Sequence, residues 1–483
     1  MGREDQIISE RLRKLDEIKK ENINPYPEKF DKKQTCQECS ETKIGSKVKT
    51  AGRVMSKRDL GKIIFCVLKD FSGKVQLVLQ DKETPNSEKD FFTKYIDSGD
   101  FVGVSGEIIK TKTGEISILV KKIELLSKSI MPLPEKWKGL QEEEEKLRKR
   151  YLDILMNDEL KEMFVKKSKF WNVIRSFLLE HGFIEVETPV LEESAGGAAA
   201  TPFRTHHNAL NIDVYLRISM GELWQKKLMV AGYEKTFEIG RQFRNEGMDI
   251  EHLQDYTQME FYWAYANYED GMKIVEEMYK KIAKEVFGTM KFEIHGHKVD
   301  FSKKWETYDF ESVIKKYSGI NIYKSDVKEI KNKLKELKVE YKESSDKWRL
   351  IDALWKYCRK KLSGPGFLTG QPVELAPLAK RNPEDKKKVE QFQVILAGSE
   401  VGNGYSELND PLDQEERFKE QMKQKESGDT ESMEHDKSFV EALKYGMPPV
   451  CGFGVSERLF GFLVDKPLRE TVIFPLMKPE SKD

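Results

Sequence analysis

The pattern of apolar and polar positions changes along the chain. Between residues 47 and 130, short runs rich in β-branched residues alternate with turns such as Asp70-Phe-Ser-Gly73 and Thr111-Lys-Thr-Gly114. The runs are Val48–Val54, Ile63–Leu68, Val75–Leu79, Phe101–Ile109 and Ile116–Leu126. Five short strands with such turns predict a small β-barrel of the OB type, which we place at residues 46–130.

Apolar residues recur at helical spacing before this barrel. Residues 5–22 carry isoleucines and leucines every three or four positions among charges, which predicts an amphipathic helix ending before Asn24-Pro-Tyr-Pro27. The helix and the extended residues after it form an N-terminal segment, residues 1–45. The helix either packs on its own domain or contacts a nucleic acid, and the pattern is compatible with both.

A different organisation follows the barrel. Met131-Pro-Leu-Pro134 opens a linker at residues 131–150, and an apolar helical stripe between Leu160 and Leu178 then stops at Gly182. Strands and helices mix after that point without a regular βαβ repeat, which predicts an α+β domain with an antiparallel sheet flanked by helices, residues 151–483. Its lysine- and glutamate-rich residues 303–360 predict a helical insertion.

Composition limits the class of protein. The chain of 483 residues is 34% charged and 38% hydrophobic, enough apolar residues to build a core. Its 83 basic and 83 acidic residues cancel, so contact with nucleic acid must come from local patches. No apolar run approaches the ~18 residues of a membrane span, and no apolar segment begins the chain. We therefore expect a cytoplasmic protein without a membrane partner.

The five cysteines are scattered, as in a protein of a reducing compartment. Cys36 and Cys39 have the spacing of metal ligands, but a zinc ion needs four ligands and no second pair follows. We expect these two residues to be surface thiols.

Two segments carry the groups needed to bind a nucleotide. In Phe237–Gly247, running on to Tyr256–Tyr262, a turn between strand-like runs holds Arg244, whose forked donors suit a phosphate. Glu246 on the same turn can accept from a base amine, and Tyr256 or Phe243 can cover a base. Near the C-terminus, glycines precede a second arginine in Gly452–Phe460, namely Arg458. Two arginines on separate strands suit one polyphosphate, and no glycine-rich Walker loop is present.

These residues resemble motifs two and three of the class II aminoacyl-tRNA synthetases. Phe243-Arg-Asn-Glu-Gly247 matches motif two, Gly454-Val-Ser-Glu-Arg458 matches the end of motif three, and Gly182–Pro189 is the counterpart of motif one. Gly196–Ala200, Thr205–Asn208 and Gly402–Asp410 are similar to segments of the class II lysyl-tRNA synthetases. The resemblance covers about residues 10–480, in a shared order and spacing.

The resemblance implies a role for each residue that would bind ATP. Arg244 would hold the amino-acid carboxylate and the α-phosphate, and Arg458 would bind the outer phosphates. Glu246 would accept from the adenine amine, Tyr256 would stack on the ring, and His252 would contact ATP. Because the charge that develops on the α-phosphate is met by fixed arginines, no proton transfer is required.

The resemblance also implies an acidic pocket for L-lysine. Glu222 would hold the α-ammonium, while Glu260 and Glu407 with Tyr262 would hold the side-chain ammonium. The remaining contacts would be the ring of Tyr405 along the methylene chain, Asn403 at the carboxylate and the backbone at Gly197. Mg²⁺ would enter with ATP and use Glu400 and Glu407, but Gln393 stands where the family has an acid.

In the barrel, basic residues beside an aromatic residue suit a single-stranded nucleic acid. Arg53 and Arg58, with Lys57 and Lys62, would contact the backbone, and Phe65 would stack on a base. The resemblance assigns Phe65, Gln76 and Glu115 to the reading of the anticodon. The same type of barrel also serves protein contacts, and Glu115 can equally be a plain acid beside a turn.

The implied activity is the ATP-dependent activation of L-lysine to lysyl-adenylate, followed by transfer to the 3′ end of tRNA(Lys). Motif one with Pro189 implies a homodimer. The alternatives are aspartyl- or asparaginyl-tRNA synthetases, whose pocket would centre on a cation. A further alternative is a relative that acts on a protein acceptor, which would lack the barrel. Another is a non-catalytic RNA-binding protein, in which we would expect arginines or acids of the site to be lost.

Overall fold

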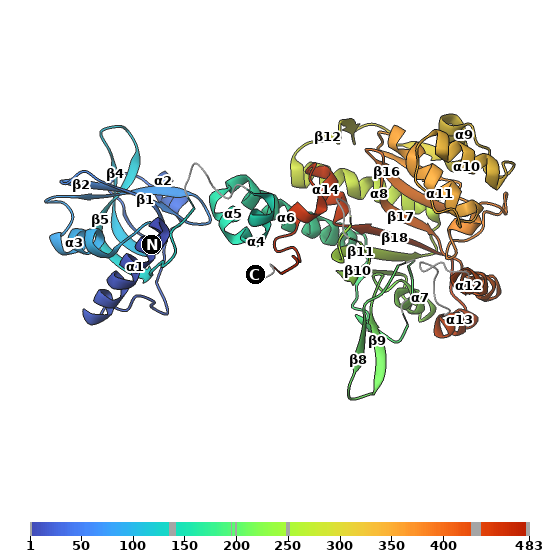
Figure 1. The fold of residues 1–483 in the computed structure, drawn as a ribbon, viewed down its shortest axis with the longest axis horizontal. Coiled ribbons are helices and arrows are strands. Elements are labelled where there is room, and N and C mark those ends of the chain that lie inside the picture. The colour runs from blue at the N-terminus through green and yellow to red at the C-terminus, as the bar shows by residue number, and fades with distance from the viewer. Residues whose placement is uncertain are drawn as a thin grey trace. The chain divides into compact units, whose positions relative to one another are not determined.

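A computed structural model describes residues 2–134, 142–194, 196–198, 200–247, 252–426 and 436–479, without the side chains of 423–426. The chain divides into two compact units, Met1–Met156 and Asn157–Asp483 (Figure 1). The linker expected at residues 131–150 and the Gly196–Ala200 motif lie partly outside the described residues. No helix in the described ranges has both the length and the apolar character needed to cross a membrane.

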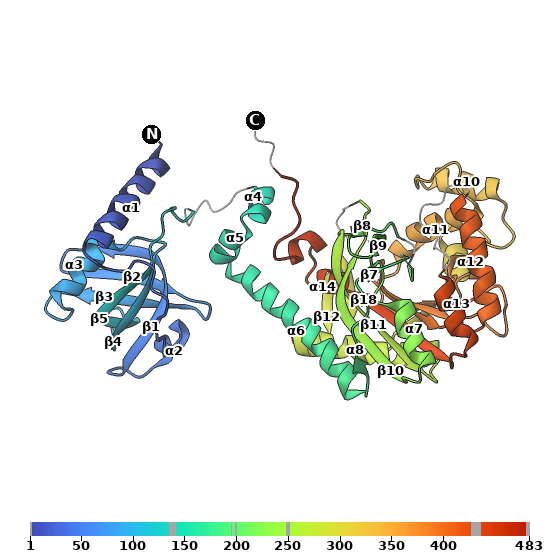
Figure 2. The same ribbon diagram turned by 90° about the horizontal axis from the view of Figure 1, so that it is seen from below.

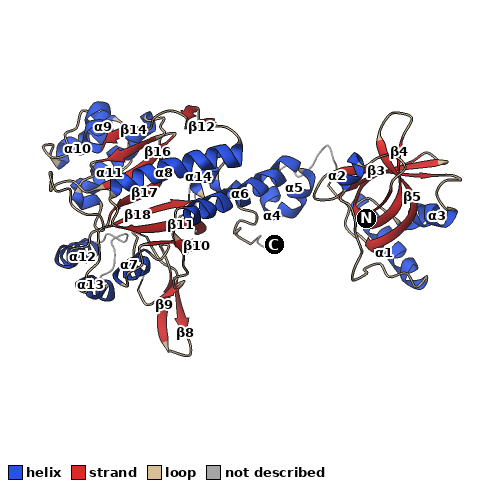
Figure 3. Ribbon diagram, turned by 180° about the vertical axis from the view of Figure 1, so that it is seen from behind, coloured by secondary structure: helices blue, strands red, loops and turns tan. Residues whose placement is uncertain are grey.

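The N-terminal unit contains the predicted five-stranded barrel. The barrel closes in the order β1-β2-β3-β5-β4, with only the β3–β5 pair parallel. Its strands are drawn in red in Figure 3. The strands are β1 (Lys47–Asp59), β2 (Ile63–Lys69), β3 (Lys74–Gln80), β4 (Phe101–Lys110) and β5 (Ile116–Ser127). The helices are α1 (Arg3–Lys20), α2 (Cys36–Glu41), α3 (Asn86–Tyr95), α4 (Glu143–Arg148) and α5 (Arg150–Met156).

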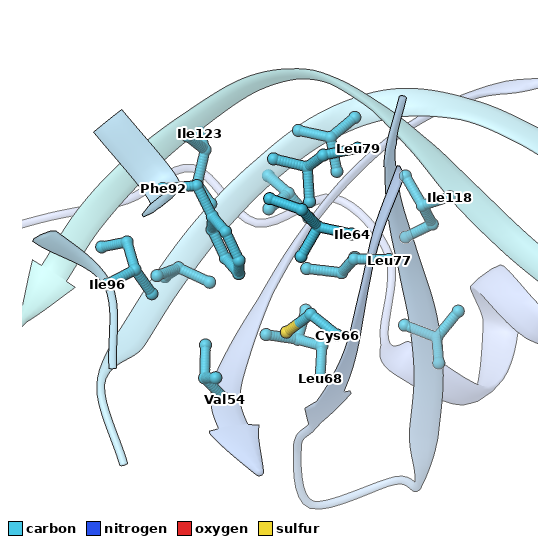
Figure 4. Close-up of a cluster of buried hydrophobic side chains, with 14 of the residues drawn as sticks. Val54, Ile64, Cys66, Leu68, Leu77, Leu79, Phe92, Ile96, Ile118 and Ile123 are labelled. Atoms are coloured by element: carbon cyan, nitrogen blue, oxygen red, sulfur yellow. The ribbon is translucent and has the colours of Figure 1, made fainter. Parts of the chain in front are cut away.

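Alternation along the strands builds the core of this barrel. Figure 4 shows Val54, Ile64, Leu68, Leu77 and Ile118 pointing into one cluster of buried side chains. Every second residue of a strand faces inward, so the apolar positions of the five runs meet there. Burial of these side chains is the main stabilising contribution, at about 25 cal/mol per Å² of apolar surface.

The prediction that Cys36 and Cys39 are surface thiols is wrong. Both side chains are fully buried in the same cluster, because their spacing places them on one face of α2. The Asp70 carboxylate accepts from the Cys36 backbone N–H at 2.8 Å and thereby ties α2 to the β2–β3 turn. Burial raises the pKa of the Cys36 thiol to about 12, so it stays protonated at neutral pH.

Helix α1 packs on its own unit. Leu15 and Ile18 are buried, and the Arg11 guanidinium donates to the Ser98 carbonyl at 2.7 Å. On the same side, Lys14 pairs with Asp97 at 2.7 Å. The C-terminal half of the predicted apolar stripe is therefore covered by its own unit, while Leu12 is 45% exposed.

The C-terminal unit is built on an eight-stranded, mainly antiparallel sheet, as the sequence predicts. Its order is β14-β15-β16-β17-β18-β11-β10-β6, with parallel pairs only at the two ends. These strands are β6 (Ile184–Glu185), β10 (Lys235–Phe243), β11 (Asp255–Ala264), β14 (Glu306–Asp309), β15 (Gly366–Thr369), β16 (Gln391–Leu396), β17 (Ser399–Ser406) and β18 (Val450–Ser456). The small sheets are β7 (Leu191–Glu192), β8 (Arg204–His207) and β9 (Ile212–Leu216), and β12 (Lys291–Ile294) with β13 (His297–Asp300).

Helices pack on this sheet. Helix α8 (Tyr268–Ile282) contacts β16, β17 and β18, and α6 (Asp158–Glu180) lies beside α8 (Figure 2). Helix α7 (Glu222–Val230) contacts β11, and α12 (Pro411–Glu426) and α13 (Lys437–Lys444) gather near it in Figures 1 and 3. Residues 303–360 contain α9 (Phe310–Ser318), α10 (Val327–Glu336) and α11 (Lys347–Cys358), and α14 (Arg458–Leu463) follows β18.

Candidate active site

One cavity of about 380 Å³ lies over the central strands of the C-terminal unit. Its walls come from β11, α7, β16, β17 and β18, together with Arg244 just after β10 and residues 375–379. Most residues that the resemblance assigns to substrate contribute to its lining. They are Gly197, Glu222, Arg244, Tyr256, Glu260, Tyr262, Gln393, Glu400, Asn403, Tyr405, Glu407 and Arg458.

The strand register explains why these distant residues meet. Glu260 of β11 pairs with Gly454 of β18, which pairs with Asn403 of β17. Two residues along each strand, a second row is formed by Tyr262, Gly452 and Tyr405. Side chains two apart on a strand share a face, so the two rows line the same side of the sheet.

The glycines of the motif-three segment make room for the acids. A Cβ added at Gly452 would lie 2.1 Å from Glu407 Oε1, and one at Gly454 would lie 3.2 Å from Glu260 Cγ. The first distance is well inside van der Waals contact, so Gly452 is required by the position of the Glu407 carboxylate.

The two arginines both line the cavity, from opposite sides of β11. Arg244, just after β10, directs Nε and Nη2 to the Ile218 carbonyl at 3.4 Å each, and its guanidinium lies 5.7 Å from the centre of the Tyr256 ring. Arg458, just after β18, donates from Nη2 to Ser399 Oγ at 3.2 Å. Both guanidinium groups line the cavity, where they could meet an anionic ligand.

Glu260 belongs to a hydrogen-bonded chain along β10 and β11. Its carboxylate accepts from the Tyr262 hydroxyl at 3.0 Å, from Gln258 Nε2 at 2.6 Å and from the Met220 backbone N–H at 3.2 Å. Gln242 Nε2 in turn donates to Gln258 Oε1 at 2.8 Å. Burial raises the pKa of Glu260, and the nearby charge of Glu222 raises it further.

A buried lysine, absent from the sequence-based assignment, joins the other two acids. Lys226 Nζ lies 2.8 Å from Glu222 Oε1 and 2.6 Å from Glu407 Oε2, and its side chain is 1% exposed. The Tyr405 hydroxyl donates to the same Glu222 oxygen. Because Glu222 and Lys226 stand four apart on α7, the sequence did hold a signal for their contact.

The expected metal ligand Glu400 is held by protein donors. Trp355 Nε1 donates to its Oε1 at 2.6 Å, Arg359 Nη1 pairs with the same oxygen at 3.1 Å, and Gln393 Nε2 donates to Oε2 at 3.1 Å. Among the described residues, no group of three or more histidine, cysteine, aspartate or glutamate side chains could hold a metal ion. A divalent cation here would depend on oxygens of its substrate and on water.

Two expected ATP contacts do not line the cavity. Glu246 is exposed, and its Oε1 accepts from the Thr201 backbone N–H at 2.9 Å. His252 is also exposed. The intervening residues 248–251 lie outside the described ranges, and the roles of Glu246 and His252 stay predictions.

In the N-terminal unit, four of the expected anticodon residues share one face of the barrel. Phe65 of β2 pairs with the exposed Arg58 of β1, and Val67, two residues on, pairs with Gln76 of β3. Gln76 Nε2 donates to Glu115 Oε2 at 2.8 Å. An aromatic ring, a guanidinium and a pair of edge-reading groups therefore lie together on the outside of the barrel.

Arg53 is engaged elsewhere. Its guanidinium lies 4.1 Å from the centre of the Phe101 ring and donates to the Gly99 carbonyl at 2.9 Å. Lys57 is likewise used within the unit, where Nζ donates to the Phe92 carbonyl at 3.1 Å.

Fold and cavity together define a class of protein, and comparison with known families agrees. The model of class II tRNA synthetases (D, K and N) matches residues 142–478, and that of the OB-fold nucleic acid binding domain matches residues 48–126.

Among individual relatives, the lysine–tRNA ligases of Thermosipho africanus and Thermotoga maritima are each 42% identical, covering 98% of this chain and 96% of their own. That of Dehalococcoides mccartyi strain CBDB1 is 40% identical and covers 98% of both chains. The chain belongs to the family of lysine–tRNA ligases.

Proposed function

We propose that this chain activates L-lysine with ATP in the cavity over β11, β17 and β18 and transfers the lysyl group to tRNA(Lys). The observation that carries the proposal is the meeting of two arginines with three buried carboxylates, Glu222, Glu260 and Glu407, around one space. Arginines suit phosphates and a carboxylate, while buried acids suit the ammonium groups of lysine.

In the first step, the lysine carboxylate attacks the α-phosphate of ATP, and pyrophosphate leaves. Arg244 stabilises the charge on the α-phosphate, and Arg458 holds the outer phosphates. In the second step, the 3′-hydroxyl of the terminal ribose attacks the lysyl carbonyl, and AMP leaves. No side-chain nucleophile takes part, so catalysis rests on positioning and electrostatics.

The pocket argues against the aspartyl and asparaginyl alternatives. Their side chains would bring a negative or neutral group toward Glu260 and Glu407, and neither could satisfy these buried acids. The non-catalytic alternative gains no support, since Arg244, Glu260, Glu407 and Arg458 are all present and line one cavity.

The direct test is amino-acid-dependent ATP–pyrophosphate exchange with lysine, arginine, ornithine, aspartate and asparagine. We expect exchange with lysine alone. Exchange with aspartate or asparagine would refute the pocket assignment, and exchange with none of them in folded protein with Mg²⁺ would point to a non-catalytic role.

Mg²⁺ is expected to enter with ATP, neutralising phosphate charge. Glu400 and Gln393 fit a Mg²⁺ site with one carboxylate. Arg359 already partly balances the negative charge of that carboxylate. We expect Gln393→Glu to lower the Mg²⁺ concentration at half-maximal exchange, because a second carboxylate binds Mg²⁺ better than an amide. Mn²⁺ binding followed by electron paramagnetic resonance with a non-hydrolysable ATP analogue should show the same tightening.

Gln393→Leu is the matched variant, since it removes the amide without adding charge. This variant should not lower the Mg²⁺ concentration at half-maximal exchange. Identical Mg²⁺ titrations for the wild type and Gln393→Glu would reject a metal role for this position.

The barrel face is proposed to read the anticodon of tRNA(Lys). Phe65→Ala should lower kcat/KM for tRNA in aminoacylation roughly 10- to 100-fold, because a stacked base contributes about 1–3 kcal/mol. Pyrophosphate exchange without tRNA should be unchanged. Phe71→Ala, in the β2–β3 turn, is the control, and an equal loss in both variants would contradict a specific role for Phe65.

We also propose a homodimer through the motif-one segment and a cytoplasmic location. Ile184 of this segment and Val190 and Leu191 just after it are 53%, 42% and 48% exposed, which is costly for large apolar side chains left in water. Light scattering should give twice the mass of one chain, and an active monomer would overturn the dimer.

A further inference from the structure

The proposed lysine site already contains a lysine of the protein itself. Lys226 is fully enclosed, with Nζ between Glu222 and Glu407 and 5.6 Å from the centre of the Tyr405 ring. Such an ammonium is costly to bury unless acids surround it. The mechanism proposed above gives it no task.

A count of charge suggests that task. Three buried carboxylates line the site, Glu222, Glu260 and Glu407, while the nearby Tyr262 and Tyr405 are neutral. When all three acids are ionised, as we expect with L-lysine bound, the ammonium of Lys226 brings the net charge of the cluster to −2 (three acids minus one ammonium). Without substrate, burial raises the pKa of Glu260 to about 7 and that of Glu407 to about 8. L-Lysine brings two ammonium groups, and its carboxylate is met by Arg244. The cluster therefore matches the two cations of the substrate only while Lys226 is charged.

The contacts of Lys226 occupy one oxygen atom in each of two carboxylates. Lys226 engages Oε1 of Glu222 and Oε2 of Glu407. Glu222 Oε1 additionally accepts from Tyr405, while Glu407 Oε1 lies over Gly452. Lys226 thus engages one oxygen of each carboxylate, and the second oxygen of each would remain for a substrate cation.

We propose that Lys226 is a positioning residue that balances the charge of the site and fixes Glu222 and Glu407 for the two ammonium groups of L-lysine. This inference rests on the proposed function. A purely structural Lys226, which only ties α7 to the residues after β17, would affect stability without a selective effect on lysine.

The test compares Lys226→Met with Lys226→Arg, using Lys227→Met as the matched control. Lys227 is the next residue of α7, and its Nζ instead donates to Ser438 Oγ at 2.8 Å. The measurements are KM for lysine and for ATP in pyrophosphate exchange, binding of L-lysine by calorimetry, and Tm.

We expect Lys226→Met to raise KM and Kd for lysine roughly 10- to 100-fold, the usual range for a lost charged hydrogen bond. KM for ATP should change less than threefold. Lys226→Arg should recover most of the affinity, and Lys227→Met should resemble the wild type. Lysine affinity within threefold of wild type in folded Lys226→Met would overturn the inference.

A double-mutant cycle keeps the test decisive if Lys226→Met folds poorly. In Glu222→Gln, the cluster has a net charge of −1, and adding Lys226→Met returns it to −2. In this background the lysine substitution should cost less than threefold in lysine affinity, and a further loss of tenfold or more in the folded double variant would contradict the charge balance. Failure of wild-type protein to exchange with lysine would instead refute the proposed function.

Discussion

An Arg244→Ala variant should lose about 10³-fold in kcat/KM for lysine-dependent pyrophosphate exchange, the range for removing a fixed charge that stabilises a transition state at phosphorus. The guanidinium lines the cavity, and its hydrogen bonds to the Ile218 carbonyl are long, 3.4 Å each. It is therefore free to follow the α-phosphate and the lysine carboxylate. The loss should appear in kcat as well as in KM, because the charge it meets grows during attack.

Arg241, on β10 three residues before Arg244, provides the matched control. Its side chain is 50% exposed and pairs with Asp255 at 2.7 Å. Arg241→Ala should keep exchange within about twofold, as expected when an exposed ion pair is removed. Similar losses in the two variants would mean that Arg244 acts through the fold of β10 and not through substrate.

The second large effect is expected for Glu260→Gln, which should lower kcat/KM for lysine roughly 10²- to 10³-fold. The carboxylate receives three donors, from Tyr262, Gln258 and Met220. In Glu260→Gln, the amide N–H₂ would face one of these three donors. The substitution would also remove the negative charge that a lysine ammonium needs. KM for ATP should stay within about threefold, because Glu260 faces the amino acid in the proposed mode of binding.

Selectivity gives this prediction its sharpest readout. The ratio of kcat/KM for lysine to kcat/KM for norleucine, which lacks the side-chain ammonium, should fall in Glu260→Gln. The control is Glu277→Gln on α8, whose side chain is 66% exposed. Unchanged selectivity in Glu260→Gln would place the side-chain ammonium elsewhere in the cavity.

Much of the architecture could be predicted because local patterns agree with the fold. The alternating runs of residues 47–130 became the barrel strands, and the mixed order after Gly182 became an antiparallel sheet with helices. Motif order brought Arg244, Glu260, Glu407 and Arg458 to the lining of one cavity.

Other features depend on contacts between distant segments, which no local pattern reports. The burial of Cys36 arises from the packing of α2 on the barrel, and Arg359 meets Glu400 only when α11 lies near β17. Lys226 lies outside every motif of the resemblance. Only the placement of Glu407 beside α7 shows that its ammonium is enclosed.

The order of strands in the large sheet also bears on how the protein becomes active. Arg244 and Arg458 lie 214 positions apart (458 minus 244), yet only β11 separates their two strands, β10 and β18. Contacts between such distant segments form slowly, since a long loop must close first. The proposed nucleotide site is complete only once β18, the last strand along the chain, has paired with its neighbours. During refolding, pyrophosphate exchange should therefore recover only when the whole sheet has formed. This recovery should be slower than the return of the spectroscopic signal of the helices.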